Sequence, residues 1–232
     1  MKLLHIVATP RNHTSHTRRV SDAFLAYARA KHPDLNVEVV DLFNQDLPSI
    51  AGENIESKYE LMYGQKIDKR HEESWKQIEL QIEHFLSADL YLITTPMWNF
   101  GIPYALKFYI DAIVQPGYLF KYNEMGQAIG LVAGRKMICV TSRGGDYSAG
   151  TPFHAYDFQE PYLRAIFGFV GITDMQFVNA QPMDVTTELR EVATAAAIEQ
   201  AKRIVDTMDW SVKPAAEKEN PLTLKPRVLV EG

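Results

Sequence analysis

The sequence predicts an α/β fold: a doubly wound, five-stranded parallel sheet in the order 2-1-3-4-5, with helices on both faces. Short apolar runs alternate along the chain with segments whose apolar residues recur at helical spacing, which is the pattern of a parallel sheet covered on both sides. The length of 232 residues suits one such domain. Hydrophobic residues make up 46% of the chain and charged residues 23%, so a core of normal size is expected and disorder throughout is excluded.

Each strand is predicted from a short run of apolar or β-branched residues. Residues 3–8 are continuously apolar, as expected for a strand buried on both faces. The second strand is expected at 37–40, and the third at 90–94, which is rich in β-forming residues. The fourth and fifth are expected at 136–141 and 175–178. Right-handed crossovers between these strands place a ligand crevice at the carboxyl ends of the first and third, where the chain changes direction.

The connecting helices are predicted from apolar residues that recur on one helical face. They are expected at 15–31, 75–86, 102–114, 161–170 and 188–208. Pro103 falls in the first turn of the third helix, where its missing N–H group costs nothing. Gly171 follows the fourth helix and closes it.

Two segments fit this pattern poorly. Residues 44–74 form a longer connection than such a fold needs, with a short helix indicated around Ile55, Tyr59 and Met62. That connection is either a lid or interface, or a surface insertion. We assign residues 1–209 to the ligand-binding domain and residues 210–232 to a C-terminal tail. The tail is either an arm that docks on a partner subunit or a frayed end.

Charge and cysteine content exclude several classes of function. The formal net charge of −5 argues against a nucleic-acid-binding protein, which would need a basic face. The single cysteine, Cys139, cannot form an internal disulfide and indicates a reducing compartment, so a cytoplasmic location is expected. Apolar runs are too short for membrane insertion. Without repeated Cys and His spacing, we expect no metal site.

The loop after the first strand carries several hydroxyl groups at the start of a helix. Thr9, Thr14, Ser15 and Thr17 lie in a segment without either glycine-rich nucleotide-binding motif. The free N–H groups and positive end of a helix bind a phosphate monoester there, and Arg11 and Arg18 add positive charge. Neutral donors favour a flavin mononucleotide over a nucleoside triphosphate. The alternative is that Thr14 or Ser15 only caps the helix.

The loops after the third and fourth strands complete the predicted crevice. Residues 95–103 combine two prolines with aromatic, thioether and amide side chains, which suit the walls of a flat tricyclic ring. Residues 141–150 contain Gly144 and Gly145, which let main-chain N–H groups approach an anionic ring edge. The alternatives are a buried helix start for the first loop and a flexible turn for the second. No catalytic side chain is assigned, because a bound cofactor would carry the reaction.

These loops together resemble the FMN-dependent NADH:azoreductase family, within the flavodoxin-like NAD(P)H:quinone oxidoreductases. The similarity extends over most of residues 1–208 and is most specific at 96–100, 141–145 and 167–174. It implies a flavodoxin-like fold with bound FMN. The FMN-binding residues that it implies are Thr9, Ser15, His16, Thr17, Met97, Trp98, Asn99, Phe100, Ser142, Arg143, Gly144 and Gly145. His16 stands where the family phosphate loop often has glutamine.

The resemblance also implies the assembly and the reaction. Family members are homodimers with active sites at the interface, and residues 120–122 match a segment that reaches over the flavin of the other subunit. Tyr122 is therefore a candidate substrate-pocket residue, and Tyr147, which falls in another segment that lines the pocket in the family, is the second candidate. NADH or NADPH would donate hydride, and quinones or azo compounds would take two electrons, in a ping-pong sequence. The alternatives are a flavodoxin-like FMN electron carrier and a flavin-free interaction module.

Overall fold

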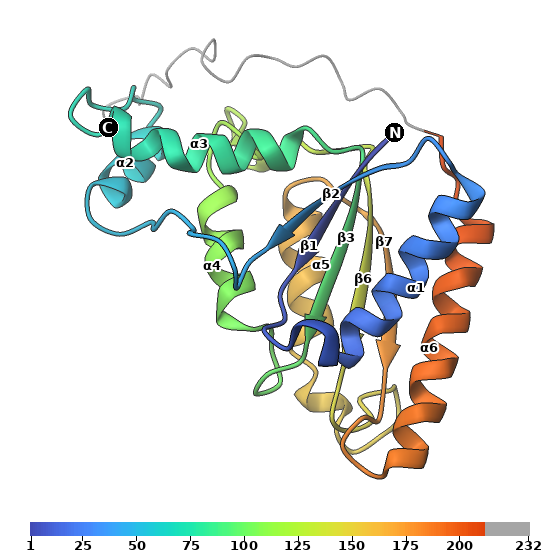
Figure 1. The fold of residues 1–232 in the computed structure, drawn as a ribbon. Coiled ribbons are helices and arrows are strands. Elements are labelled where there is room, and N and C mark those ends of the chain that lie inside the picture. Colours follow the sequence, from blue (N-terminus) through green and yellow to red (C-terminus); the bar gives the residue numbers. More distant parts are fainter. Residues whose placement is uncertain (212–232) are drawn as a thin grey trace.

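The computed structural model describes residues 1–211 and contains a five-stranded parallel sheet. The strands are β1 (Lys2–Val7), β2 (Asn36–Asp41), β3 (Leu90–Pro96), β6 (Lys136–Ser142) and β7 (Asp174–Ala180), in the order β2-β1-β3-β6-β7 (Figure 1). Val7 lies opposite Thr94, and Pro96 lies opposite Ser142, so the carboxyl ends of β1, β3 and β6 meet at one edge. The predicted tail, apart from residues 210 and 211, lies outside the described residues.

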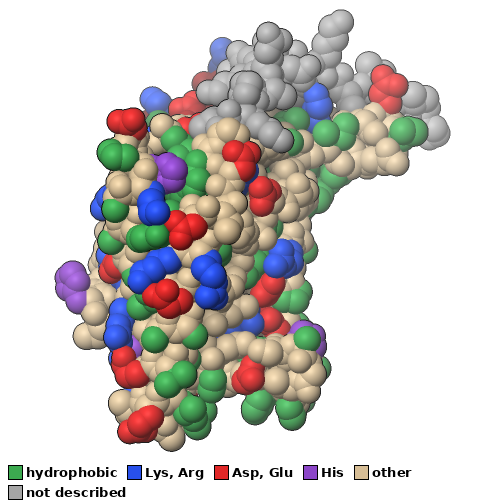
Figure 2. All heavy atoms as spheres, turned by 90° about the vertical axis from the view of Figure 1, so that its right-hand side faces the viewer, with side chains coloured by type: hydrophobic (Ala, Val, Ile, Leu, Met, Phe, Trp, Pro, Cys, Tyr) green, Lys and Arg blue, Asp and Glu red, His purple; other side chains and the backbone are tan. Residues whose placement is uncertain are grey.

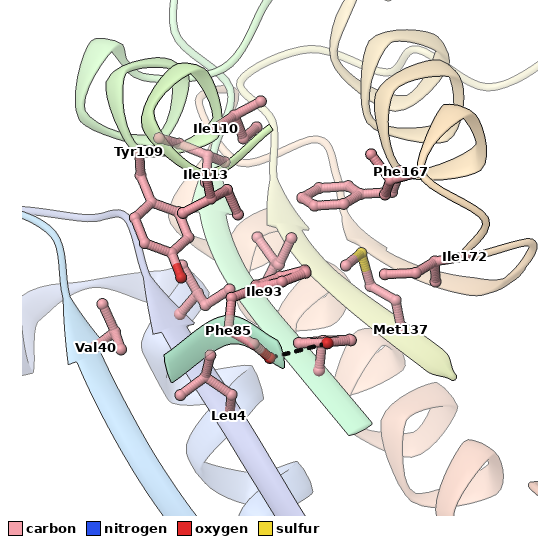
Figure 3. Packing of buried hydrophobic residues seen from close by; sticks show 14 of the residues in the cluster. Leu4, Val40, Phe85, Ile93, Tyr109, Ile110, Ile113, Met137, Phe167 and Ile172 are labelled. Atoms are coloured by element: carbon pink, nitrogen blue, oxygen red, sulfur yellow. Dashed lines mark hydrogen bonds between the residues drawn. The ribbon is translucent and has the colours of Figure 1, made fainter. Parts of the chain in front are cut away.

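Helices cover both faces of the sheet (Figure 1). Helices α1 (His16–Lys31) and α6 (Thr187–Thr207) pack on one face, and α3 (Glu72–Leu86), α4 (Tyr104–Ile113) and α5 (Gln159–Phe169) pack on the other. Successive strand residues point to opposite faces. Leu3 belongs to the core under α1 and α6, and Leu4 belongs to the core under the other three helices, part of which Figure 3 shows. The prediction of helices on both faces is confirmed.

The long connection between β2 and α3 contains a helix, α2 (Glu53–Met62), where Ile55, Tyr59 and Met62 indicated one. Helix α3 begins at Glu72, three residues before the expected start. Helix α5 begins at Gln159 and not at Pro161, which instead lies in the first turn, where its missing N–H group is tolerated. Asp157 explains this earlier start, because its carboxylate accepts hydrogen bonds from the N–H groups of Gln159 and Glu160, at 3.0 and 3.1 Å.

A hairpin formed by β4 (Phe120–Tyr122) and β5 (Ala128–Gly130) was not predicted. The strands predicted as fourth and fifth are therefore β6 and β7. The hairpin packs against the end of α5, where the rings of Phe120 and Phe169 lie 4.7 Å apart. Since α5 ends just before β7 begins, this contact lies at the amino edge of the sheet. The hairpin thus lies at the edge opposite to the predicted crevice.

The face formed by α1 and α6 is strongly charged. Figure 2 shows Lys and Arg side chains interspersed with Asp and Glu over this side of the molecule. Arg19 pairs with Glu191 at 2.8 Å, and Lys31 pairs with Asp206 at 3.3 Å. These ion pairs join α1 to α6 at a solvated surface. Among residues 1–211, no helix has the length and apolar character needed to cross a membrane.

Candidate functional site

The turn between β1 and α1 brings the predicted hydroxyl groups together. Ser15 caps α1, since its Oγ accepts a hydrogen bond from the N–H of Arg18 at 3.3 Å. The same Oγ accepts a hydrogen bond from the Thr9 hydroxyl at 3.1 Å. Both bonds leave the Ser15 proton available as a donor. The cap that the sequence offered as an alternative is therefore present, and it leaves a donor at the start of the helix.

Ser142, the last residue of β6, connects this turn to the other two loops. Its hydroxyl and that of Thr17 lie 2.5 Å apart, and its carbonyl accepts a hydrogen bond from the N–H of Met97 at 2.8 Å. The three predicted loops are therefore bonded to one another at the carboxyl edge of the sheet. Of the two hydroxyl protons of Thr17 and Ser142, one is used between them and the other remains available.

The turn after β3 presents aromatic side chains at the surface. Trp98 and Gly101 exchange two backbone hydrogen bonds, at 3.0 and 2.9 Å, which close the turn. Asn99 and Phe100 inside it have positive φ values of 48° and 70°, a region that costs energy for residues other than glycine. Trp98, Asn99 and Phe100 are all exposed. This result disfavours the alternative of a buried helix start.

The loop after β6 differs from the expectation in the direction of one side chain. The Arg143 side chain is only 2% exposed, and its Nη1 donates to a carboxylate oxygen of Asp157 at 2.8 Å. The guanidinium is therefore bound inside the protein, and the backbone N–H and carbonyl of Arg143 are bonded to Ala180 and Met183, so this residue supports the loop from within. Asp157 lies 14 residues later in the chain, so the sequence pattern around the glycines gave no sign of the pair.

The two glycines are closely packed. A Cβ atom on Gly144 would lie 2.7 Å from Oδ2 of Asp184, and one on Gly145 would lie 3.5 Å from the rings of Tyr147 and Phe153. The carbonyl of Gly144 accepts hydrogen bonds from the N–H groups of Met183 and Asp184, both at 3.0 Å. These contacts tie the loop to the segment after β7, so it is not a flexible turn.

The two candidate pocket tyrosines lie at different edges of the sheet. Tyr147 is buried beside Phe153, with ring centroids 5.8 Å apart, and it follows the glycine loop directly. Tyr122 is in the hairpin, at the amino edge, where its ring packs edge-on against Phe120. The structure therefore brings Tyr147, but not Tyr122, to the predicted crevice of its own chain.

The charges near the α1 turn are partly compensated. Arg18 lies 3.7 Å from a carboxylate oxygen of Asp41, at the end of β2. Burial, followed by the charges of Arg190 and Arg11, lowers the pKa of His16. His16 is therefore neutral at neutral pH, and hydroxyl and N–H groups dominate the start of the helix.

Two residues of the site were not predicted: Asp157, which accepts a hydrogen bond from Arg143, and Gln159, which bonds to the turn after β3. Gln159 is fully buried and donates from Nε2 to the carbonyl of Pro96 at 2.8 Å. Asp157, followed three residues later by Glu160, is a capping signature that could have located this helix start.

Comparison with known proteins supports the geometry. A family model described as a flavodoxin-like fold matches residues 1–205. The FMN-dependent NADH:quinone oxidoreductase of Nitratidesulfovibrio vulgaris is 41% identical over 204 residues, which are 87% of this chain and 97% of that protein. This chain therefore belongs to the flavodoxin-like family of FMN-dependent NADH:quinone oxidoreductases. The enzyme of the same name from Nostoc punctiforme is 39% identical over 79% of this chain and 88% of its own length.

Solved structures of family members have the same architecture. An azoreductase from Bacillus anthracis superimposes with a TM-score of 0.80 at 27% identity, covering 89% of this chain and 99% of that one. An FMN-dependent NADH-azoreductase from the same species, solved in complex with FMN, has a TM-score of 0.76 at 30% identity. It covers 88% of this chain and 99% of its own.

Proposed function

We propose that this protein is an FMN-dependent NAD(P)H oxidoreductase that reduces quinones, azo compounds or both. One observation carries the proposal: Ser142 bonds the hydroxyl-lined turn of α1 and the aromatic turn of β3 together at the carboxyl edge of the sheet. Open α/β sheets bind their ligands at this edge. Bound FMN would supply the hydride chemistry, and the protein would bind, orient and tune it.

The donors at the start of α1 fit a phosphate monoester. Ser15 and one of the Thr17 and Ser142 hydroxyls retain protons that can be donated. The N–H groups of the first turn of α1 have no acceptor within the helix. An anion there also gains from the positive end of the helix dipole. These residues supply neutral hydrogen-bond donors that suit a single phosphate group.

The turn after β3 fits the flat tricyclic ring of FMN. Trp98 and Phe100 offer exposed apolar surface, and the Asn99 amide offers both a donor and acceptors. On the other side, the backbone of residues 142–145 is held firmly by its bonds to residues 180–184. We assign the ring to the space between these loops, with Tyr147 beside it.

The two substrates are expected to bind in turn. The nicotinamide ring, quinones and azo compounds are all flat. Each would therefore bind the same exposed aromatic surface near Trp98 and Phe100. Shared occupancy predicts ping-pong kinetics with NADH or NADPH as the donor. Initial rates measured while both substrates are varied should give parallel double-reciprocal lines, and intersecting lines would contradict shared occupancy.

The proposed assembly is a homodimer with its active sites at the interface. Tyr104 and Phe108 lie on the outer side of α4, are 70% and 38% exposed, and adjoin the aromatic turn through the contact of Tyr104 with Trp98. Exposed apolar surface of this kind marks an interaction site. A second copy would also bring the hairpin with Tyr122 to a crevice that it does not reach within its own chain.

A cytoplasmic location is part of the proposal. The chain's one cysteine, Cys139, is buried in β6, and this burial raises the pKa of its thiol. A chain with a single cysteine has no partner for an internal disulfide, which fits a reducing compartment.

The visible absorption spectrum of the purified protein, before and after anaerobic addition of NADH, tests the proposed function. We expect flavin bands that bleach rapidly and return when a quinone is added. Flavin bands that NADH does not bleach would favour an electron carrier. A colourless protein that fails to bind added FMN would contradict the assignment altogether.

A further inference from the structure

The turn after β3 is held in an unfavourable backbone conformation by contacts from outside it. Asn99 and Phe100 have consecutive positive φ values of 48° and 70°, a backbone region that is unfavourable for residues other than glycine. Such conformations persist where the surrounding structure fixes them. The contacts that fix this turn are therefore part of the construction of the site.

The beginning of α5 provides two of those contacts. The N–H of Phe158 donates to the carbonyl of Phe100 at 3.0 Å, and Nε2 of Gln159 donates to the carbonyl of Pro96 at 2.8 Å. The two carbonyls flank residues 97–99, so α5 holds both sides of the segment assigned to the ring.

The orientation of the Gln159 amide is set by Arg143. Oε1 of Gln159 accepts a hydrogen bond from Nε of Arg143 at 3.2 Å, and a guanidinium can only donate. The amide must therefore present its NH2 group to Pro96. Arg143 is in turn fixed by Asp157, which also caps α5, and by backbone bonds to Ala180 and Met183 at 3.0 and 2.9 Å.

This polar network is buried, with the side chains of Arg143 and Asp157 only 2% and 8% exposed. Replacing a buried ion pair by apolar residues of similar size is often neutral or stabilising, so such a pair is weak support for a stabilising role. Here the network joins Arg143 of the glycine loop, through Gln159, to the carbonyl of Pro96 in the aromatic turn. Both loops are assigned to the flavin, and they are 47 residues apart in the sequence.

We propose that Gln159, oriented by Arg143, is a positioning residue that holds the turn at residues 96–101 in register with the loop at residues 142–145, so that both loops contact the flavin together. The proposal rests on the proposed function, because it concerns FMN binding. It assigns no chemical step to Gln159, which contacts the loops and not the reacting atoms.

Gln159→Glu tests the hydrogen bond to Pro96 separately from the one to Arg143, with almost no change in side-chain volume. The carboxylate still accepts from Arg143, but it places an oxygen against the Pro96 carbonyl and repels it. Gln159→Met, which introduces no charge, removes both contacts and serves as the second variant. Gln115→Glu is the matched control: Gln115 is also fully buried and donates to the carbonyls of Asp111 and Ala112, but it lies at the end of α4 away from the crevice.

The measurements are the FMN dissociation constant of the apoprotein, the midpoint potential of the bound flavin, and urea unfolding of the apoprotein. Both Gln159 variants should weaken FMN binding at least tenfold and shift the midpoint potential. If affinity for one redox state falls tenfold more than for the other, the shift is about 30 mV for a two-electron couple. Gln115→Glu should lower stability and leave both flavin measurements unchanged.

Wild-type affinity and potential in a folded Gln159 variant would overturn the inference. So would loss of stability alone, as in the control. These outcomes are distinct from failure of the proposed function, in which the wild-type apoprotein itself would not bind FMN.

Discussion

His5 is a buried histidine that makes the stability of this protein depend on pH. It lies in β1, and its Nε2 is 2.7 Å from the hydroxyl of Thr94. Burial, with smaller effects of the Arg18 and Arg29 charges, lowers its pKa from 6.5 to about 3. Between these values the unfolded chain binds a proton that the folded protein does not, so the free energy of unfolding falls as the pH is lowered from 6.5 toward 3.

His5→Gln should reduce this acid sensitivity, because glutamine does not titrate. The wild-type apoprotein should lose on the order of 4 kcal/mol more stability than the variant between neutral pH and pH 3. Urea unfolding of both proteins over this range measures the difference. If the free energies of unfolding of the two proteins change in parallel with pH, His5 is not the group that causes the acid sensitivity.

Tyr109 has a fully buried hydroxyl with no hydrogen-bond partner among residues 1–211. Its side chain points from α4 toward the strands (Figure 3), and burial raises its pKa. Tyr109→Phe should therefore be neutral or stabilise the protein by up to about 2 kcal/mol.

Tyr91→Phe is the matched comparison for that change, measured by the same urea unfolding. The Tyr91 hydroxyl donates to the carbonyl of Phe85 at 3.0 Å and accepts from Arg135 at 2.6 Å. Its removal should cost about 1–2 kcal/mol. Equal destabilisation by the two substitutions would mean that the Tyr109 hydroxyl has a partner after all.

Among the elements, the β4–β5 hairpin depends on one glycine. A Cβ atom on Gly130 would lie 2.3 Å from backbone atoms of Val170 and Gly171, and backbone cannot move aside as a flexible side chain can. Gly130→Ala should therefore cost about 3 kcal/mol or displace the hairpin. Urea unfolding and proteolytic cleavage within residues 120–130 measure these effects.

Gly168→Ala in the adjacent α5 is the control for the hairpin variant. A Cβ atom there meets nothing within 4 Å, so the change should be neutral or stabilise by up to about 1 kcal/mol. If Gly130→Ala behaves in the same way, the hairpin does not need its close approach to residues 170 and 171, which follow α5.

The five sheet strands were predictable because each contains a run of apolar or β-branched residues, long enough to be distinct from its surroundings. The hairpin was not, since its strands have three residues each, which is too short for a pattern of alternation to stand out. At the site, the hydroxyl and aromatic residues were recognisable from their loops. The inward direction of Arg143 and the role of Gln159 were not, because both depend on a tertiary contact between loops distant in sequence.

At the scale of the whole molecule, the outer side of α4 differs from the face formed by α1 and α6. The former exposes the aromatic rings of Tyr104 and Phe108, whereas the latter exposes no aromatic ring of α6 and carries ion pairs between the two helices. Phe108→Glu should therefore weaken the proposed dimer at least tenfold, or about 1.4 kcal/mol. Analytical ultracentrifugation over a range of concentrations measures the dissociation constant.

Val192→Glu is the corresponding substitution on the charged face. Val192 is 66% exposed on α6, so the additional carboxylate should leave the assembly unchanged. If both variants stay as dimeric as the wild type, α4 does not form the contact. If both dissociate, the effect is one of net charge and not of a particular surface.

Because the hairpin lies at the amino edge, the two edges of the sheet would contribute to two different active sites. In the proposed dimer, a single polypeptide retains its own cofactor with one end of the sheet and helps to select its neighbour's acceptor with the other. In that arrangement, substitutions at exposed hairpin positions such as Tyr122 should change the range of molecules reduced more than the affinity for FMN, which makes them the positions at which to redesign specificity.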